Sequence, residues 1–73
     1  MRRFYIPPED IGRHRAILKG EEARHAINVL RLGKGDDAVV FDGRGKEYAA
    51  RIATLDGRQV TLDLVAELPG RPE

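Results

Sequence analysis

Two Asp-Gly dipeptides, at 42–43 and 56–57, separate three strand-like runs in the second half of this chain, of which the first is apolar throughout and the other two alternate between apolar and polar residues. The three runs cover 38–41, 47–55 and 60–66. Asp-Gly favours the tight turn of a β-hairpin, and a period of two is typical of a strand with one buried face. The sequence therefore predicts a meander of three antiparallel strands.

The last of these strands has the clearest pattern. Its apolar positions, expected to face the core, are Val60, Leu62, Leu64 and Ala66. Polar residues stand between them, so this strand is expected to show one face to the core and the other to water. In the middle strand, Ala50 and Ile52 are expected to share the buried side with Tyr48, and Arg51 to lie on the opposite side.

The first half of the chain carries two shorter strand signals. Arg3–Ile6 is an aromatic and β-branched run that ends at Pro7 and Pro8, which cannot donate hydrogen bonds to a neighbouring strand. It is expected to be a first or edge strand. Glu9–Arg13 is polar and is expected to be a loop, and His14–Lys19 follows as a second short strand.

One helical pattern lies between these halves, at about 21–31. Its apolar residues recur at the spacing of one helix face: Ala23, Ala26, Ile27 and Leu30. Glu21 and Glu22 stand in the first turn, where acidic side chains favour the helix dipole, and Arg31 stands near the last. Gly33 follows, where a residue with positive φ is expected.

These elements predict a mainly β fold: a small, largely antiparallel β-barrel with one short α-helix at about 21–31. An open α+β sandwich is the alternative that periodicity alone leaves open. With 73 residues, the chain has room for one domain, which we place at 1–68. Residues 69–73 contain two prolines and a glycine, a composition typical of a linker, so a further domain is expected to follow.

The composition excludes several classes of site. The chain has no cysteine, so there is neither a disulfide framework nor a thiolate metal site, and its two histidines have no metal-ligand spacing. It has no serine either, so catalysis by this chain alone is not expected. Asp36 and Asp37, and the glycines at 33–35 and 43–45, are interpreted as turn residues. No run is apolar enough to span a membrane or target one, and a cytoplasmic location fits the lack of cysteine.

Charge is distributed unevenly between the two halves. Met1–Lys34 carries eight Lys or Arg against four Asp or Glu, a net charge of +4, whereas Gly35–Glu73 carries five against eight, a net charge of −3. A basic half in a chain of net charge +1 predicts a surface that faces a polyanion such as RNA. The alternative is an ordinary solvated surface with scattered charges.

The candidate RNA-binding residues are Arg2, Arg3, Arg24, His25, Arg31 and Lys34. Arg2, Arg3 and Arg31 form one basic surface if the first strand lies near the end of the helix, with Phe4 or Tyr5 as an aromatic plane beside them. One of these two aromatics must face the core. His25 lies opposite the apolar face of the helix, where it can stack on a base or donate to a phosphate. An exposed pair with Glu21, four residues earlier, is the competing interpretation.

The order and spacing of several short motifs resemble one family. The motifs are Met1–Tyr5, Gly20–Ala23, His25, Val29–Arg31, Gly35-Asp36 and Phe41–Gly43. Over 1–68 they resemble the N-terminal domain of the 16S ribosomal RNA uridine-N3 methyltransferases, the RsmE family. Arg3, His25 and Arg31 match positions that are basic in the family pattern. Asn28 departs from it, because such sequences often carry another basic residue there.

The resemblance implies a PUA-like β-barrel that binds 16S rRNA, or the small ribosomal subunit, and presents it to a C-terminal SPOUT methyltransferase domain. That domain would bind S-adenosylmethionine, transfer the methyl group to N3 of a uridine and form a homodimer. This chain would then supply RNA binding, with no catalytic, cofactor or metal site of its own. The alternative function is a small β-barrel that binds a protein partner or acts as a scaffold.

Overall fold

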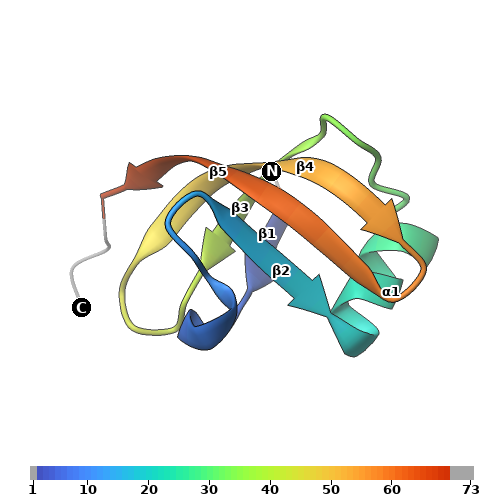
Figure 1. Cartoon of the computed structure of the whole chain (residues 1–73), viewed down its shortest axis with the longest axis horizontal. Helices are drawn as coiled ribbons and strands as arrows, with labels where there is room; N and C mark the ends of the chain where they lie inside the picture. The colour runs from blue at the N-terminus through green and yellow to red at the C-terminus, as the bar shows by residue number, and fades with distance from the viewer. Residues whose placement is uncertain (1, 70–73) are drawn as a thin grey trace.

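The computed structural model describes residues 2–69, within which the chain forms five strands, a 3₁₀ turn and one α-helix (Figure 1). In chain order the elements are β1 (Arg2–Tyr5), η1 (Pro8–Asp10), β2 (Arg15–Lys19), α1 (Gly20–Asn28), β3 (Asp37–Phe41), β4 (Glu47–Asp56) and β5 (Gln59–Leu68). The mainly β fold with one helix is confirmed. The expected linker lies outside the described residues apart from Pro69. No helix in this range is long and apolar enough to cross a bilayer.

The five strands form one sheet in the order β1-β3-β4-β5-β2. Three neighbouring pairs are antiparallel, including both predicted hairpins, and only β1 and β3 run parallel. β1 and β2 are the two edge strands, and they do not pair with each other. The sheet curls into a half-barrel, which is therefore not closed by hydrogen bonds between strands (Figure 1). Pro7 and Pro8 end β1 after four residues, which agrees with the edge strand expected there.

Two register shifts between β4 and β5 help the sheet to curl. Ala49 pairs with Ala66 but Ala50 pairs with Leu64, and a second shift lies between Ile52 and Thr54. Each shift places one extra residue in one strand, which bends the strand and increases its twist. The predicted alternation of β5 holds only in its first part. Val60 and Leu62 are buried as predicted, but Leu64, next to the shift at Ala49 and Ala50, is half-buried and Ala66 is exposed.

The core lies on one face of the sheet, and α1 packs against it at one end of the molecule (Figure 1). Phe4 and Ile6 from the β1 end of the chain pack with Val40, Ile52 and Leu62. The helix adds Ala23 and Ala26, both fully buried, and the predicted Ile27 and Leu30 are partly buried against the same cluster. The predicted inner face of the helix is therefore confirmed. Phe4 is the aromatic that faces the core, and Tyr5 is 46% exposed.

The helix begins and ends earlier than its apolar pattern predicts. Gly20, with φ of 63°, already belongs to α1 and turns the chain directly out of β2. After Asn28 the chain leaves the helix, and the amides of Leu30 and Leu32 donate to the carbonyls of His25 and Ala26. Arg31 takes the positive φ of 54° that was expected at Gly33. Leu30 is apolar because it packs against the core from outside the helix. Its helical spacing from Ala23 and Ala26 therefore does not mean that the helix extends to it.

Candidate nucleic-acid interface

All six candidate RNA-binding residues are exposed, and they come from three segments. Arg2 and Arg3 lie on the edge strand β1, Arg24 and His25 lie on α1, and the other two candidates follow the helix. Arg31 and Lys34 belong to the connection from α1 to β3. The candidates are therefore accessible to a ligand, as a binding surface requires.

The structure brings three of the six candidates together in a surface hollow of about 430 Å³, called here the helix hollow. Its lining residues are Arg2, Arg3, Phe4, Glu22, His25 and Leu30. The expected approach of β1 to the helix therefore occurs. Arg24, Arg31 and Lys34 are not among its lining residues, although Arg31 follows directly after Leu30 in the chain. The hollow is not uniformly basic, because Glu22 also lines it.

Arg3 is held in place by two contacts on the outer side of β1. Its guanidinium donates to Oε1 of Glu47 at 2.8 Å, and its Cζ lies 5.1 Å from the ring centroid of Phe41. Phe41 in turn lies 5.9 Å from the ring of Tyr5, centroid to centroid. The aromatic plane beside the arginine is thus Phe41, which is brought to β1 by strand pairing and is remote from it in the sequence.

His25 faces outward from α1 beside two acidic residues. A second hollow of about 420 Å³ is lined by Glu21, Glu22 and His25. Within residues 2–69, no ion pair joins Glu21 to His25, so the imidazole remains available to a ligand. In the same part of the chain, His, Asp and Glu side chains do not gather in a group that could hold a metal ion.

Ion pairing separates the basic side chains into two classes. The paired cations are Arg3, Arg15, Lys19 and Arg51, whose partners are Glu47, Asp63, Asp10 and Asp37. Among the described residues, Arg2, Arg24, Arg31 and Lys34 make no such pair. A cation that makes no ion pair can bind a phosphate without first breaking one. Four of the five candidate cations are therefore unpaired, and Arg3 is the exception.

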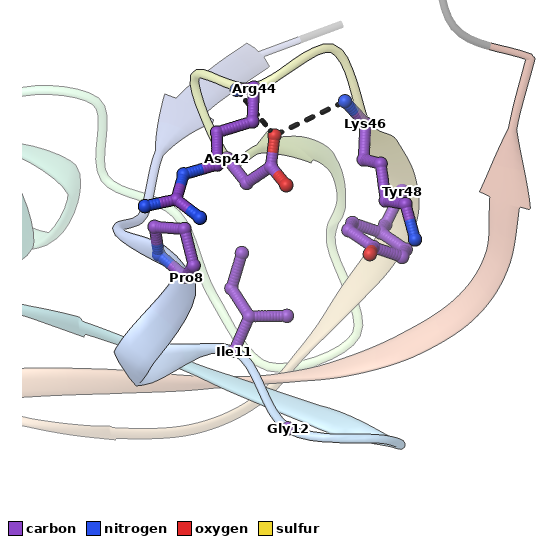
Figure 2. Close-up of a pocket in the computed structure, with 7 residues that line it drawn as sticks. All are labelled: Pro8, Ile11, Gly12, Asp42, Arg44, Lys46 and Tyr48. Atoms are coloured by element: carbon purple, nitrogen blue, oxygen red, sulfur yellow. Dashed lines mark hydrogen bonds between the residues drawn. The ribbon is translucent and has the colours of Figure 1, made fainter.

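A further hollow, called here the turn pocket, was not anticipated from the sequence. It lies between η1 and the β3–β4 turn and measures about 340 Å³ (Figure 2). Its lining residues are Pro8, Ile11, Gly12, Asp42, Arg44, Lys46 and Tyr48. The sequence predicts only a reversal at 43–45, which is correct for the backbone, since Gly43 and Gly45 have φ of 77° and 100°.

Asp42 organises the turn that carries two of the pocket's cations. Its side chain is only 8% exposed, and Oδ1 accepts the backbone N–H groups of Arg44 at 2.7 Å and Lys46 at 3.1 Å (Figure 2). The hydrogen bond from the Arg44 amide lowers the pKa of this carboxyl, and the Lys46 amide and charge act in the same direction against the effect of burial. Asp42 is therefore held as a carboxylate that fixes the turn.

The cations of the turn pocket could have been found from one signal. Arg44 and Lys46 alternate with glycine directly after Asp42, and a tight turn of this kind exposes its charged side chains. Their proximity to Pro8 and Ile11 is different, because these residues are more than 30 positions away and only the fold brings them together. Because the second half of the sequence has a net charge of −3, its overall charge did not indicate this local group of cations.

The chain matches one family model and several solved structures. The family model for an RNA methyltransferase PUA domain matches residues 18–65. No match is found among curated proteins. The fold is similar to that of ribosomal RNA small subunit methyltransferase E of Neisseria gonorrhoeae bound to S-adenosylmethionine, with 32% identity and a TM-score of 0.77, over 93% of this chain and 28% of that one.

Two other solved structures have the same fold. A protein of Legionella pneumophila assigned as a methyltransferase, solved with bound S-adenosylmethionine, is 30% identical with a TM-score of 0.83, over 97% of this chain and 29% of its own. A predicted RNA methyltransferase of Thermotoga maritima is 25% identical with a TM-score of 0.82, over 100% of this chain and 32% of its own. This chain thus spans about three tenths of the length of these structures.

Proposed function

This chain belongs to the family of RNA methyltransferase PUA domains, and we propose that it binds and positions RNA for a ribosomal RNA methyltransferase. In the finer form of the proposal, the substrate is a uridine of 16S rRNA that is methylated at N3. Two observations support this form: the family motifs of the sequence, and the similarity to a protein named for the small ribosomal subunit.

The observation that carries the proposal is the helix hollow. Arg2 and Arg3 come from one edge of the sheet and His25 from the helix, and all three line the same exposed hollow. Arg2, which makes no ion pair among the described residues, can neutralise phosphate, and histidine donates to phosphate or stacks on a base. Arg2 and His25 therefore match the chemistry of an RNA strand, whereas Arg3 would have to leave Glu47 to do so. Unpaired Arg24, Arg31 and Lys34, on the helix and the segment after it, would add charge around the hollow.

In this proposal the methyl group is transferred elsewhere in the whole protein. S-Adenosylmethionine carries a positive sulfonium centre, and the hollows of this chain that hold cations, lined by Arg2 and Arg3 or by Arg44 and Lys46, oppose it by charge. These two hollows therefore do not suit this cofactor. We assign it, together with dimerisation, to a C-terminal methyltransferase domain that follows 1–68, and place the protein in the cytoplasm with the ribosome.

The proposal is tested by fluorescence anisotropy with a labelled hairpin from small-subunit rRNA, titrated at several salt concentrations. We expect the logarithm of the affinity to fall with the logarithm of the salt concentration, at about −0.7 per phosphate contact. Arg31→Ala should weaken binding several-fold without unfolding the domain, and Arg31→Lys should retain most of it. Arg58→Ala is the matched control, because Arg58 is an exposed cation of the β4–β5 turn.

Each outcome of this experiment has a definite meaning. Binding that is steeply salt-dependent, and that responds to Arg31 and not to Arg58, supports the RNA-binding role. Preference for the hairpin over a scrambled RNA supports the 16S assignment. Absence of binding at low salt, with a folded domain, would reject the proposal and favour a protein-binding module.

A further inference from the structure

The turn pocket contains the chemical groups that a single unpaired nucleotide requires. Figure 2 shows the Arg44 guanidinium on the side of Pro8 and the Lys46 ammonium on the side of Tyr48, at opposite sides of the pocket. Neither side chain forms an ion pair within residues 2–69. Cations that line two sides of one hollow favour a phosphate that enters it.

The remaining walls of the pocket suit a base and a sugar. Pro8 and Ile11 provide apolar surface on one side, and the half-buried Tyr48 provides an aromatic ring (Figure 2). Bases stack on such rings in single-stranded RNA. Asp42, the acid that lines the pocket, accepts two backbone amides through Oδ1 and can accept a further hydrogen bond from a ribose hydroxyl or a base N–H group.

The position of the turn pocket separates it from the helix hollow. Tyr48 pairs with Glu67, and Glu47 pairs with Leu68, so β5 ends beside the pocket. In Figure 1 the end of β5 and the β3–β4 turn lie on one side of the molecule, and α1 lies on the other, along an axis of 34 Å. β5 therefore ends close to the turn pocket and away from the helix (Figure 1).

From these observations we infer that the turn pocket is a second RNA contact, which holds one unpaired nucleotide with its phosphate between Arg44 and Lys46 and its base against Tyr48. This inference rests on the proposed function. It adds to that function a division of roles: the helix hollow holds one part of the RNA, and the turn pocket holds a nucleotide at the end of the domain where the methyltransferase domain is proposed to follow.

The first experiment compares variants of the two surfaces with the same labelled hairpin. Arg44→Ala should weaken binding and reduce the magnitude of the salt slope by about 0.7, the loss of one phosphate contact. Tyr48→Leu should weaken binding at least about fivefold with an unchanged salt slope, because it removes stacking and no charge. Arg58→Ala again serves as the matched control for the loss of one charge, and should bind within about twofold of the original chain. Circular dichroism confirms that each variant is folded.

A second experiment tests the pocket without the helix hollow's contribution. Uridine 5′-monophosphate is titrated into the ¹⁵N-labelled chain and compared with inorganic phosphate. We expect the monophosphate to shift the backbone amide signals of Arg44, Lys46 and Tyr48, and inorganic phosphate to shift those of Arg44 and Lys46 alone. Equal shifts from both ligands would mean that the pocket holds only an anion, and would overturn the nucleotide assignment.

The two proposals fail in different ways. If Arg44→Ala and Tyr48→Leu bind the hairpin as the original chain does while Arg31→Ala is weakened, the pocket is not an RNA contact and the proposed function stands. If the original chain binds no RNA, the proposed function fails, and the inference about the pocket fails with it.

Discussion

Two adjacent residues, Asp42 and Gly43, set the geometry of the turn pocket. Asp42 accepts the amides that bend the chain, and Gly43 has φ of 77°, a conformation that side chains other than glycine rarely adopt. A Cβ at position 43 would also lie 2.9 Å from Cε1 of Tyr5. The close packing of the turn on β1 therefore depends on a residue without a side chain.

The stability conferred by the Asp42 carboxylate should depend on pH. Its pKa is lowered in the folded chain, so its contribution is present above the unfolded value of about 3.9 and is lost as the pH falls toward the folded value. Asp42→Asn should be less stable than the original chain at pH 7, and the difference should shrink below about pH 4. Urea unfolding at pH 7, 5, 4 and 3 measures this, and a difference that is constant with pH would contradict it.

Gly43→Ala should destabilise the domain by about 1–2 kcal/mol, through its positive φ and the close approach of Tyr5. The matched control is Gly57→Ala, because a Cβ at position 57 meets no atom within 4 Å and the backbone there has no positive φ. Urea unfolding monitored by circular dichroism compares the two. Equal stability of the two variants would mean that the turn tolerates a side chain at position 43.

At the scale of elements, α1 packs through small residues. Ala23 and Ala26 are fully buried, and the helix contacts β2 and β5 along this face. Small side chains let the nine-residue helix lie close to the sheet, which a helix this short needs because it has little stability of its own. The same packing directs His25 outward, so the helix hollow depends on these alanines.

Ala26→Leu should therefore cost about 1–3 kcal/mol, because the larger side chain overpacks the contact between α1 and the sheet. Asn28→Leu, at an exposed position of the same helix, should change the free energy of unfolding by no more than about 0.5 kcal/mol. Urea unfolding measures both variants. If Ala26→Leu is as stable as Asn28→Leu, the helix can move away from the sheet without loss.

At the scale of the whole molecule, one small core supports both surfaces. A domain of 73 residues has a total stability of about 4–11 kcal/mol. The core joins residues from β1, β3, β4, β5 and the helix in one cluster, so the helix hollow and the turn pocket cannot unfold independently of it. Loss of a single large core side chain should therefore affect both ends of the molecule.

Ile52→Ala should cost about 2–5 kcal/mol, because Ile52 is among the largest fully buried side chains, and this is a large fraction of the total. Val65→Ala, at a position 59% exposed on β5, should stay within about 0.5 kcal/mol of the original chain. Thermal unfolding followed by circular dichroism, and the dispersion of the amide signals, measure the effect. A fully folded and equally stable Ile52→Ala variant would mean that the core lies elsewhere.

The sequence by itself determined the local elements. Asp-Gly turns, period-two strands and the apolar face of one helix are encoded within a few neighbouring residues, so both hairpins, the edge strand and the helix could be predicted. It also provided the exposed basic candidates, because charged side chains rarely enter so small a core. The end of the helix was placed too late, since Leu30 is apolar for reasons of tertiary packing.

Only the tertiary structure decided which residues meet. The parallel pairing of β1 with β3 brings Phe41 beside Arg3, and the curl of the sheet brings η1 against the β3–β4 turn to form the turn pocket. These contacts join segments more than 30 residues apart, and their register depends on the packing of the whole core. Periodicity reports which face of an element is buried, but the neighbour of an exposed side chain is set by how all the elements pack together.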